Sequence, residues 1–289
     1  MINIRFQNII LAIPLCLASA PLPAASWEVD FLGPAREISH SSSASRDTAA
    51  LGLVAAPHRI LTGGGDFSVL QLRDQRLSLR LGVFAMMELE SEGKSSGFDG
   101  MPMADSNFWR GLWGYSVAAS LDDFASRHFG PRGALEFTLN IRHESEHYSG
   151  SNDGGDGIDY SDRPQIGNFV MLDVAARVPL GRLDLIGRLQ HKFFVTNAGG
   201  YSQGPGGDLI VRWRRWNHIH PFSSLFAEYL FGRKIYPDAY LVRNLTGFVV
   251  PSRAGDIYLF ISADVGNRKG LAVFTEERTL GFGVRFAFF

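Results

Sequence analysis

The chain has 289 residues, of which 45% are hydrophobic and 20% are charged, and its formal net charge is −1. There is no basic excess to neutralise phosphates, so nucleic acid is excluded as a predicted partner. After residue 25 no run of about eighteen apolar residues occurs, which excludes a membrane-spanning helix in the rest of the chain.

The first residues have the composition of a secretory signal. Arg5 precedes a short apolar stretch at 9–17, and small residues follow at 18–25. This stretch is too short to span a membrane as a helix. We therefore predict a cleaved signal peptide at 1–25 and a mature chain at 26–289, with a short N-terminal periplasmic segment before the folded part.

Alternation between apolar and polar residues recurs along most of the mature chain. It is clear at 77–89, 109–121, 135–142, 170–178, 183–190, 209–214 and 225–231, with further strands near 240–250 and 255–265. Several of these stretches are longer than the about five or six residues usual in soluble sheets. Long strands with one apolar face are typical of an all-β, transmembrane antiparallel β-barrel.

The connections between these strands alternate in length, as they do in bacterial barrels with short periplasmic turns and long external loops. Short ones are predicted at 73–76, 180–182, 218–221 and 251–254, and long ones at 91–106, 149–167, 196–207, 233–239 and 266–277, with 122–132 as a long exception. Strands from about residue 66 onward number about eleven, and closure favours an even number. A further strand near 47–61 would give about twelve, although Pro57 there leaves ten as an alternative. Gly63-Gly64-Gly65 is predicted as a tight turn.

The last strand indicates where the protein is located. Leu280, Phe282, Val284, Phe286 and Phe288 share one face, and small or charged residues occupy the other. A strand of this kind is typical of the C-terminus of bacterial outer-membrane barrels. We therefore predict an outer-membrane location, a periplasmic C-terminus, and recognition of the last strand by the barrel-assembly machinery.

Charged residues gather on the face assigned to the barrel interior. They are Arg80, Arg142, Arg177, Arg188, Arg212, Arg214 and Arg285, with Glu88, Glu136, Asp173, Asp184, Glu228 and Asp264 available to pair with them. One interpretation is an interior held together by ion pairs, and the other is a charge-selective pore. About twelve strands lie between the filled and the open barrels, so both remain open. The first predicted function is accordingly a structural or narrow-pore outer-membrane protein.

The motif His143-Glu144-Ser145-Glu146-His147 is the one constellation suited to catalysis. By parity His143, Ser145 and His147 continue the apolar face of the strand and point at the membrane. A serine beside a histidine is the minimal pair for nucleophilic catalysis, in which the imidazole takes the hydroxyl proton. A non-catalytic alternative is that the histidines lie at the lipid headgroup level, where amphipathic rings are favourable.

The His143-x-Ser145 pair resembles that of outer-membrane phospholipase A. The resemblance implies a serine-type lipid esterase acting on outer-membrane phospholipid or lipopolysaccharide, with an Asn completing the triad and calcium assisting. This chain has Glu146 where that family has Asn after the serine, and Asn152 does not align with the triad Asn. His147, or an acidic residue of 152–162, is predicted to orient His143. Whether the protein is an enzyme stays open at this point.

The loop at 151–162 contains Asp153, Asp156 and Asp159, whose carboxylates are hard oxygen ligands suited to calcium. The loop lacks the regular spacing of an EF-hand, and the alternative is a solvated external loop without metal. No other cofactor is predicted.

A second resemblance covers about residues 50–289. The stretches at 82–91, 142–150 and 268–286 resemble a family of Gram-negative outer-membrane barrels known as a domain of unknown function, whose members have a His-x-Ser-x-His stretch. This chain has Tyr148-Ser149-Gly150 where those members have Leu-Gly-Asp. The resemblance implies a barrel and its location, and no activity.

Overall fold

The structure, a computed structural model, is all-β in the part of the chain that it describes. It describes residues 28–34, 51–55, 59–74, 77–91, 108–122, 133–148, 165–197, 201–213, 219–232, 238–252, 255–266 and 277–288. The predicted signal peptide at 1–25 lies outside these residues. No helix long and apolar enough to cross a membrane occurs in the described ranges.

Thirteen strands are found in these ranges, and most are longer than ten residues. They are β1 (Glu28–Pro34), β2 (Leu51–Ala55), β3 (Arg59–Arg73), β4 (Leu77–Ser91), β5 (Phe108–Asp122), β6 (Ala134–Tyr148), β7 (Gln165–Leu180), β8 (Leu183–Asn197), β9 (Gln203–Trp213), β10 (His220–Leu230), β11 (Ala239–Ser252), β12 (Gly255–Gly266) and β13 (Glu277–Phe288).

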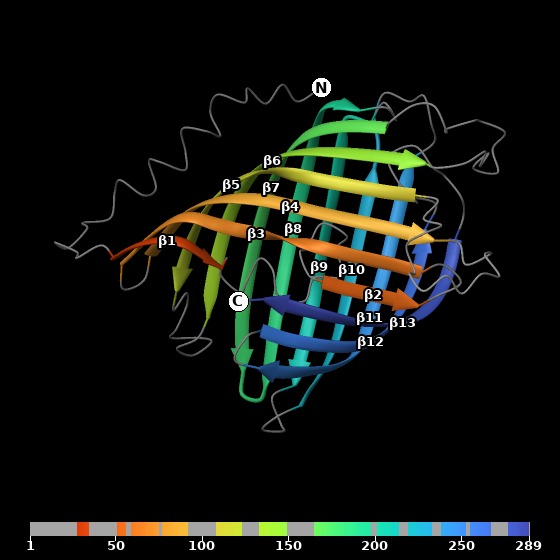
Figure 1. Ribbon diagram of the computed structural model, residues 1–289. Coiled ribbons are helices and arrows are strands. Elements are labelled where there is room, and N and C mark those ends of the chain that lie inside the picture. Colours follow the sequence, from red (N-terminus) through yellow and green to blue (C-terminus); the bar gives the residue numbers. More distant parts are fainter. Residues whose placement is uncertain are drawn as a thin grey trace.

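The strands from β2 to β13 form a closed antiparallel barrel (Figure 1). Each pairs with its neighbour along the chain, and the ring closes where β13 pairs with β2 at Phe282–Ala55 through Phe286–Leu51. These twelve strands confirm the predicted fold class and strand number. The twelfth strand is the short β2, which lies in the weakly patterned segment where it was expected and ends just before Pro57.

Two N-terminal strands share one edge of β3. Residues 52–55 of β2 pair with the first residues of β3, and β1 pairs antiparallel with its last residues, from Glu28–Arg73 to Pro34–Phe67. The sequence did not predict β1, because its seven residues show no clean alternation. β1 covers a part of the β3 edge that β2 is too short to reach, and an uncovered edge is a site for unwanted pairing.

Closure gives each strand an inner and an outer face, and the two faces differ sharply. In β6, Phe137, Leu139 and Ile141 are 47%, 42% and 58% exposed, whereas Asn140 beside them is buried at 1%. Because successive side chains of a strand point to opposite faces, the exposed apolar residues lie outside and the buried polar ones lie in the lumen. The alternation read from the sequence therefore sorts side chains as predicted.

Ion pairs occupy much of the lumen. They join Arg110 to Glu144, Arg177 to Asp184, Arg188 to Asp208, Lys192 to Glu228, Arg212 to Asp256 and Arg243 to Asp264. Some contacts reach past intervening strands: Arg212 Nη2 donates to Tyr258 Oη at 2.6 Å between β9 and β12. Likewise the Arg142 guanidinium of β6 lies 3.9 Å from the ring centroid of Phe84 on β4. These contacts agree with an interior held by ion pairs.

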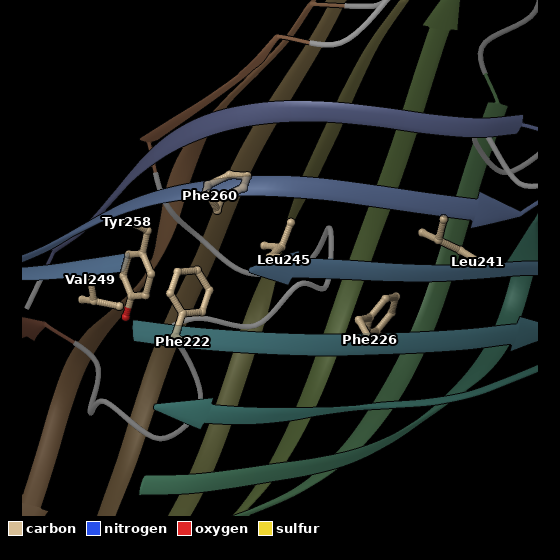
Figure 2. Close-up of a cluster of buried hydrophobic side chains, with 7 residues drawn as sticks. All are labelled: Phe222, Phe226, Leu241, Leu245, Val249, Tyr258 and Phe260. Carbon is tan, nitrogen blue, oxygen red and sulfur yellow. The ribbon is translucent and has the colours of Figure 1, made fainter. Parts of the chain in front are cut away.

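One wall of the barrel interior is apolar, which the sequence analysis did not anticipate. The side chains come from the three neighbouring strands β10, β11 and β12 (Figure 2). They are Phe222, Phe226, Leu241, Leu245, Val249, Tyr258 and Phe260. The Phe222 and Tyr258 rings meet edge to face at 5.3 Å, a favourable geometry for aromatic pairs. The interior therefore combines this apolar cluster with ion pairs, some of which involve the same strands, as Arg243 with Asp264.

The prediction of a tight turn at Gly63-Gly64-Gly65 is wrong, because the triplet lies inside β3. Gly64 has φ +147°, and a Cβ there would lie 2.2 Å from the backbone oxygen of Ala85 on β4. Glycine here permits a close approach of two backbones rather than a chain reversal.

We expect Gly64→Ala to destabilise the barrel by about 1–3 kcal/mol, since the new Cβ would collide with β4 at an unfavourable φ. The matched control is Gly187→Ala in β8, where a Cβ meets nothing within 4 Å. Urea unfolding of refolded protein in detergent measures both. Equal midpoints for the two variants would contradict the close approach at Gly64.

Candidate functional site

The structure places the His-x-Ser pair on the outer face of β6, as parity predicted. His143 and Ser145 are partly exposed, and Glu144 between them is fully buried in the lumen, where it pairs with Arg110. The anchored Glu144 fixes the orientation of this part of β6. No bulge interrupts the β6 pairing with β5 or with β7.

His143 is held by a residue of the next strand. Asn168 of β7 stands directly opposite His143 in the register, and its Oδ1 lies 2.8 Å from His143 Nδ1. On the other side, the Trp113 ring of β5 packs against the imidazole with ring centroids 4.8 Å apart. The imidazole is thus fixed from both neighbouring strands.

Asn168 is itself anchored by β8. Its Nδ2 donates to Thr196 Oγ1 at 2.8 Å. A row of four side chains, Trp113, His143, Asn168 and Thr196, therefore crosses the outer face of β5 to β8 at one level.

This row dictates the proton arrangement on the imidazole. Because Asn168 Nδ2 donates to Thr196, the amide oxygen is the atom that faces His143 Nδ1. A carbonyl oxygen only accepts hydrogen bonds, so in the neutral form of the imidazole this arrangement places the proton on Nδ1 and the lone pair on Nε2. That tautomer is the one a histidine needs to act as general base through Nε2.

Ser145 lies one pleat along β6 from His143 on the same face. Residues two apart on a strand are about 6.5–7 Å apart along it. The hydrogen bond to Asn168 occupies Nδ1 of His143 and leaves Nε2 as the ring atom available to Ser145, which would reach it only if the two side chains lean toward each other. Catalytic hydrogen bonds are often loose before substrate binds.

The remaining predicted site residues are not part of this row. His147 lies in β6, but its side chain is outside the described part of the chain, and Asp153, Asp156 and Asp159 lie outside the described residues altogether. Within the described ranges, no group of three His, Cys, Asp or Glu residues is arranged to hold a metal ion.

Asn168 is a partner of His143 that the sequence analysis did not name. His147 or an acidic residue of 152–162 was predicted for this role, and those side chains lie outside the described part of the chain. The sequence did contain an indication of Asn168. It lies on the same outward face as Val170 and Leu172, where a polar amide would face lipid and therefore needs a hydrogen-bond partner. What the sequence lacked was the register that puts it opposite His143.

Another polar group on the outer face offers a comparison. Ser223 of β10 and Asn244 and Thr246 of β11 bond to one another, with Ser223 Oγ and Thr246 Oγ1 at 3.0 Å and Thr246 donating to Asn244 Oδ1 at 2.9 Å. Those contacts satisfy polar atoms on an apolar surface and include no base. The row at His143 differs because it contains an imidazole, with Ser145 two residues further along the same face of β6.

Comparisons with known proteins give only distant likenesses. No family model and no curated protein matches the chain. The resemblance to the domain of unknown function therefore stays a prediction.

Several solved structures are similar to the chain, and two of them illustrate the likeness. One is the outer-membrane expressed OmpT of Vibrio cholerae, with 9% identity and a TM-score of 0.36 over 92% of this chain and 99% of that one. The other is CdiB from Acinetobacter baumannii, with 11% identity and a TM-score of 0.33 over 91% of this chain and 66% of that one. At these scores nothing about function follows from either.

The orientation of Ser145 can be tested with spin labels, because Cys16 in the predicted signal is the only cysteine. We expect a label on Ser145→Cys in lipid vesicles to be accessible to oxygen dissolved in the bilayer. A label on Asn140→Cys, which faces the lumen and is 1% exposed, is the matched control and is expected to be shielded. A shielded label at 145 would contradict the outward assignment.

Proposed function

We propose that this protein is a β-barrel of the bacterial outer membrane that hydrolyses ester bonds of membrane lipids, with Ser145 as nucleophile. His143 acts as the base and Asn168 orients it. The observation that carries the proposal is the hydrogen bond from His143 Nδ1 to Asn168 Oδ1, on the lipid-facing surface and beside Ser145.

The outer surface of the barrel supports the membrane location. Large apolar side chains are exposed on nearly every strand, among them Trp113, Tyr115, Phe137, Leu189, Leu225, Ile261 and Phe282. A soluble protein rarely exposes apolar residues in such a continuous band. The predicted signal peptide and the pattern of the C-terminal strand indicate that the protein is exported to the outer membrane. We expect the barrel-assembly machinery to recognise that last strand.

The chemistry follows the usual two steps of a serine esterase. Ser145 Oγ attacks the ester carbonyl carbon while its proton passes to His143 Nε2. The resulting tetrahedral intermediate collapses: the alcohol leaves with that proton, and an acyl group stays on Ser145. A water molecule then attacks the acyl-enzyme, with His143 again taking and returning the proton, and releases the fatty acid.

The position of the site favours a lipid of the outer leaflet. His143 lies in the half of β6 that leads to the long connection at 149–164, which is the external end if the short turns are periplasmic. Exposed Trp113 and Ile141 beside it offer an apolar surface for acyl chains. Phospholipid and lipopolysaccharide both have ester-linked acyl chains at this level.

The second candidate is a structural barrel without activity, favoured by the filled lumen. Glu88, Arg110, Glu144, Lys192 and Asp184 are each 1% exposed or less, although they line the inside of the barrel. If the lumen were a water-filled channel, these side chains would be accessible to solvent. Their burial therefore also argues against a narrow pore.

The esterase proposal is tested by fatty-acid release from phospholipid or lipopolysaccharide vesicles by refolded protein, with and without calcium. We expect Ser145→Ala to lower kcat by about a thousandfold or more, because nothing replaces the nucleophile. The matched control is Ser223→Ala, a polar residue of the same outer face away from the site. Activity unchanged in Ser145→Ala would refute Ser145 as nucleophile, and no release from any ester lipid would favour the structural barrel.

We expect planar bilayers containing the protein to show no steady ion-selective current, since buried side chains fill the lumen. The measurement is single-channel conductance at several voltages, with an open trimeric porin as positive control. A stable, charge-selective conductance would restore the pore interpretation.

A further inference from the structure

We infer that Thr196, turned outward by a β-bulge at Val195, is a positioning residue that holds the Asn168 amide with its oxygen against His143 Nδ1. The inference rests on the proposed function for its catalytic consequence. Its structural content, a hydroxyl on β8 that anchors the Asn168 amide beside His143, stands separately and is open to its own measurement.

The first observation is a change of register between β7 and β8. Asn168 pairs with Thr196, but the next residue of β7, Phe169, pairs with Phe194. Val195 is therefore an extra residue on β8, which is the definition of a bulge. Beyond it, the parity of β8 is reversed.

The reversal is what brings Thr196 to the outer face. Before the bulge the even-numbered residues Gln190 and Lys192 are buried in the lumen, and Phe194 packs against Phe169 with ring centroids 5.5 Å apart. Without an extra residue, Thr196 would follow them inward. With it, Thr196 is exposed and accepts the hydrogen bond of Asn168.

The second observation concerns the amide. An Asn side chain beside an imidazole can present either its oxygen or its nitrogen, and the two choices require opposite tautomers of the histidine. In the structure Nδ2 donates to Thr196 Oγ1 at 2.8 Å and Oδ1 faces His143 Nδ1, so the hydrogen bond to Thr196 anchors the amide in the orientation that places its oxygen at the imidazole. Loss of this acceptor leaves Nδ2 without its partner on an apolar surface, so the amide has less reason to keep its oxygen toward His143.

The test compares Thr196→Val, which keeps the shape and removes the hydroxyl, with Thr196→Ser, which keeps the hydroxyl. Thr246→Val removes another outer-face hydroxyl and serves as the matched control. Histidine-labelled protein refolded in micelles is examined by nitrogen NMR at a pH where the imidazole is neutral, with His143→Gln to assign the signal. Kinetics on phospholipid vesicles are measured on the same preparations.

We expect wild type, Thr196→Ser and Thr246→Val to show a His143 protonated at Nδ1, and Thr196→Val to show a mixture of tautomers. Misplacement of a catalytic group by a distant change can reduce rates by about a hundredfold. For Thr196→Val we therefore expect kcat to fall by about tenfold or more, with KM little changed and activity restored in Thr196→Ser.

An unchanged tautomer and unchanged kcat in Thr196→Val would overturn the inference. So would a wild-type His143 protonated at Nε2. If the wild type releases no fatty acid at all, the proposed function fails, but the NMR comparison still decides the inference. A tautomer shift confined to Thr196→Val would then support positioning of His143 by Thr196 without an esterase reaction.

Discussion

Closure of the hydrogen-bonded ring is the constraint on which the rest of this structure depends. Backbone groups inside a membrane find no water, so a sheet is stable there only when every strand is paired on both sides. The short β2 completes that ring between β13 and β3. Once the ring is closed, the pleat assigns each residue to the lipid or to the lumen, and both the buried ion pairs and the site on the outer face follow from this assignment.

Many of the charged side chains that point into the lumen are paired with residues of opposite charge. Buried ions are costly to desolvate, and losing one partner of a pair leaves an uncompensated charge. Here the charges are matched, as Lys192 with Glu228 at 2.6 Å and Arg243 with Asp264 at 2.6 Å. Beside them, the apolar wall around Phe226 and Phe260 needs no partners of this kind. The result is an interior of buried and paired side chains, which fixes the positions of the strands that form the outer surface.

That fixed geometry is what the outer-face site requires. His143 is held from two strands, by Trp113 on one side and by Asn168 on the other, and Asn168 is held in turn from a third strand. A side chain on a lipid-facing surface has few neighbours to restrain it, so restraint has to come from residues at the same level of adjacent strands. The hydrogen bonds among Ser223, Asn244 and Thr246 show that polar side chains also contact one another elsewhere on the outer face, in a group that contains no histidine. The presence of an imidazole, two residues along the same strand from Ser145, distinguishes the row at His143 from that group.

The sequence by itself determined the barrel, its approximate strand number and the outward direction of His143 and Ser145. These follow from an alternation with period two, which is a local property of an extended chain. The tertiary structure alone decided which residues meet: Asn168 opposite His143, Thr196 turned outward by the bulge at Val195, and the Gly64 backbone against β4. Register is set by hydrogen bonds between strands, and a slip of one residue would turn every side chain of a strand to the other face. No pattern within a single strand contains that information, and for this reason the partner of His143 could be found only in the folded barrel.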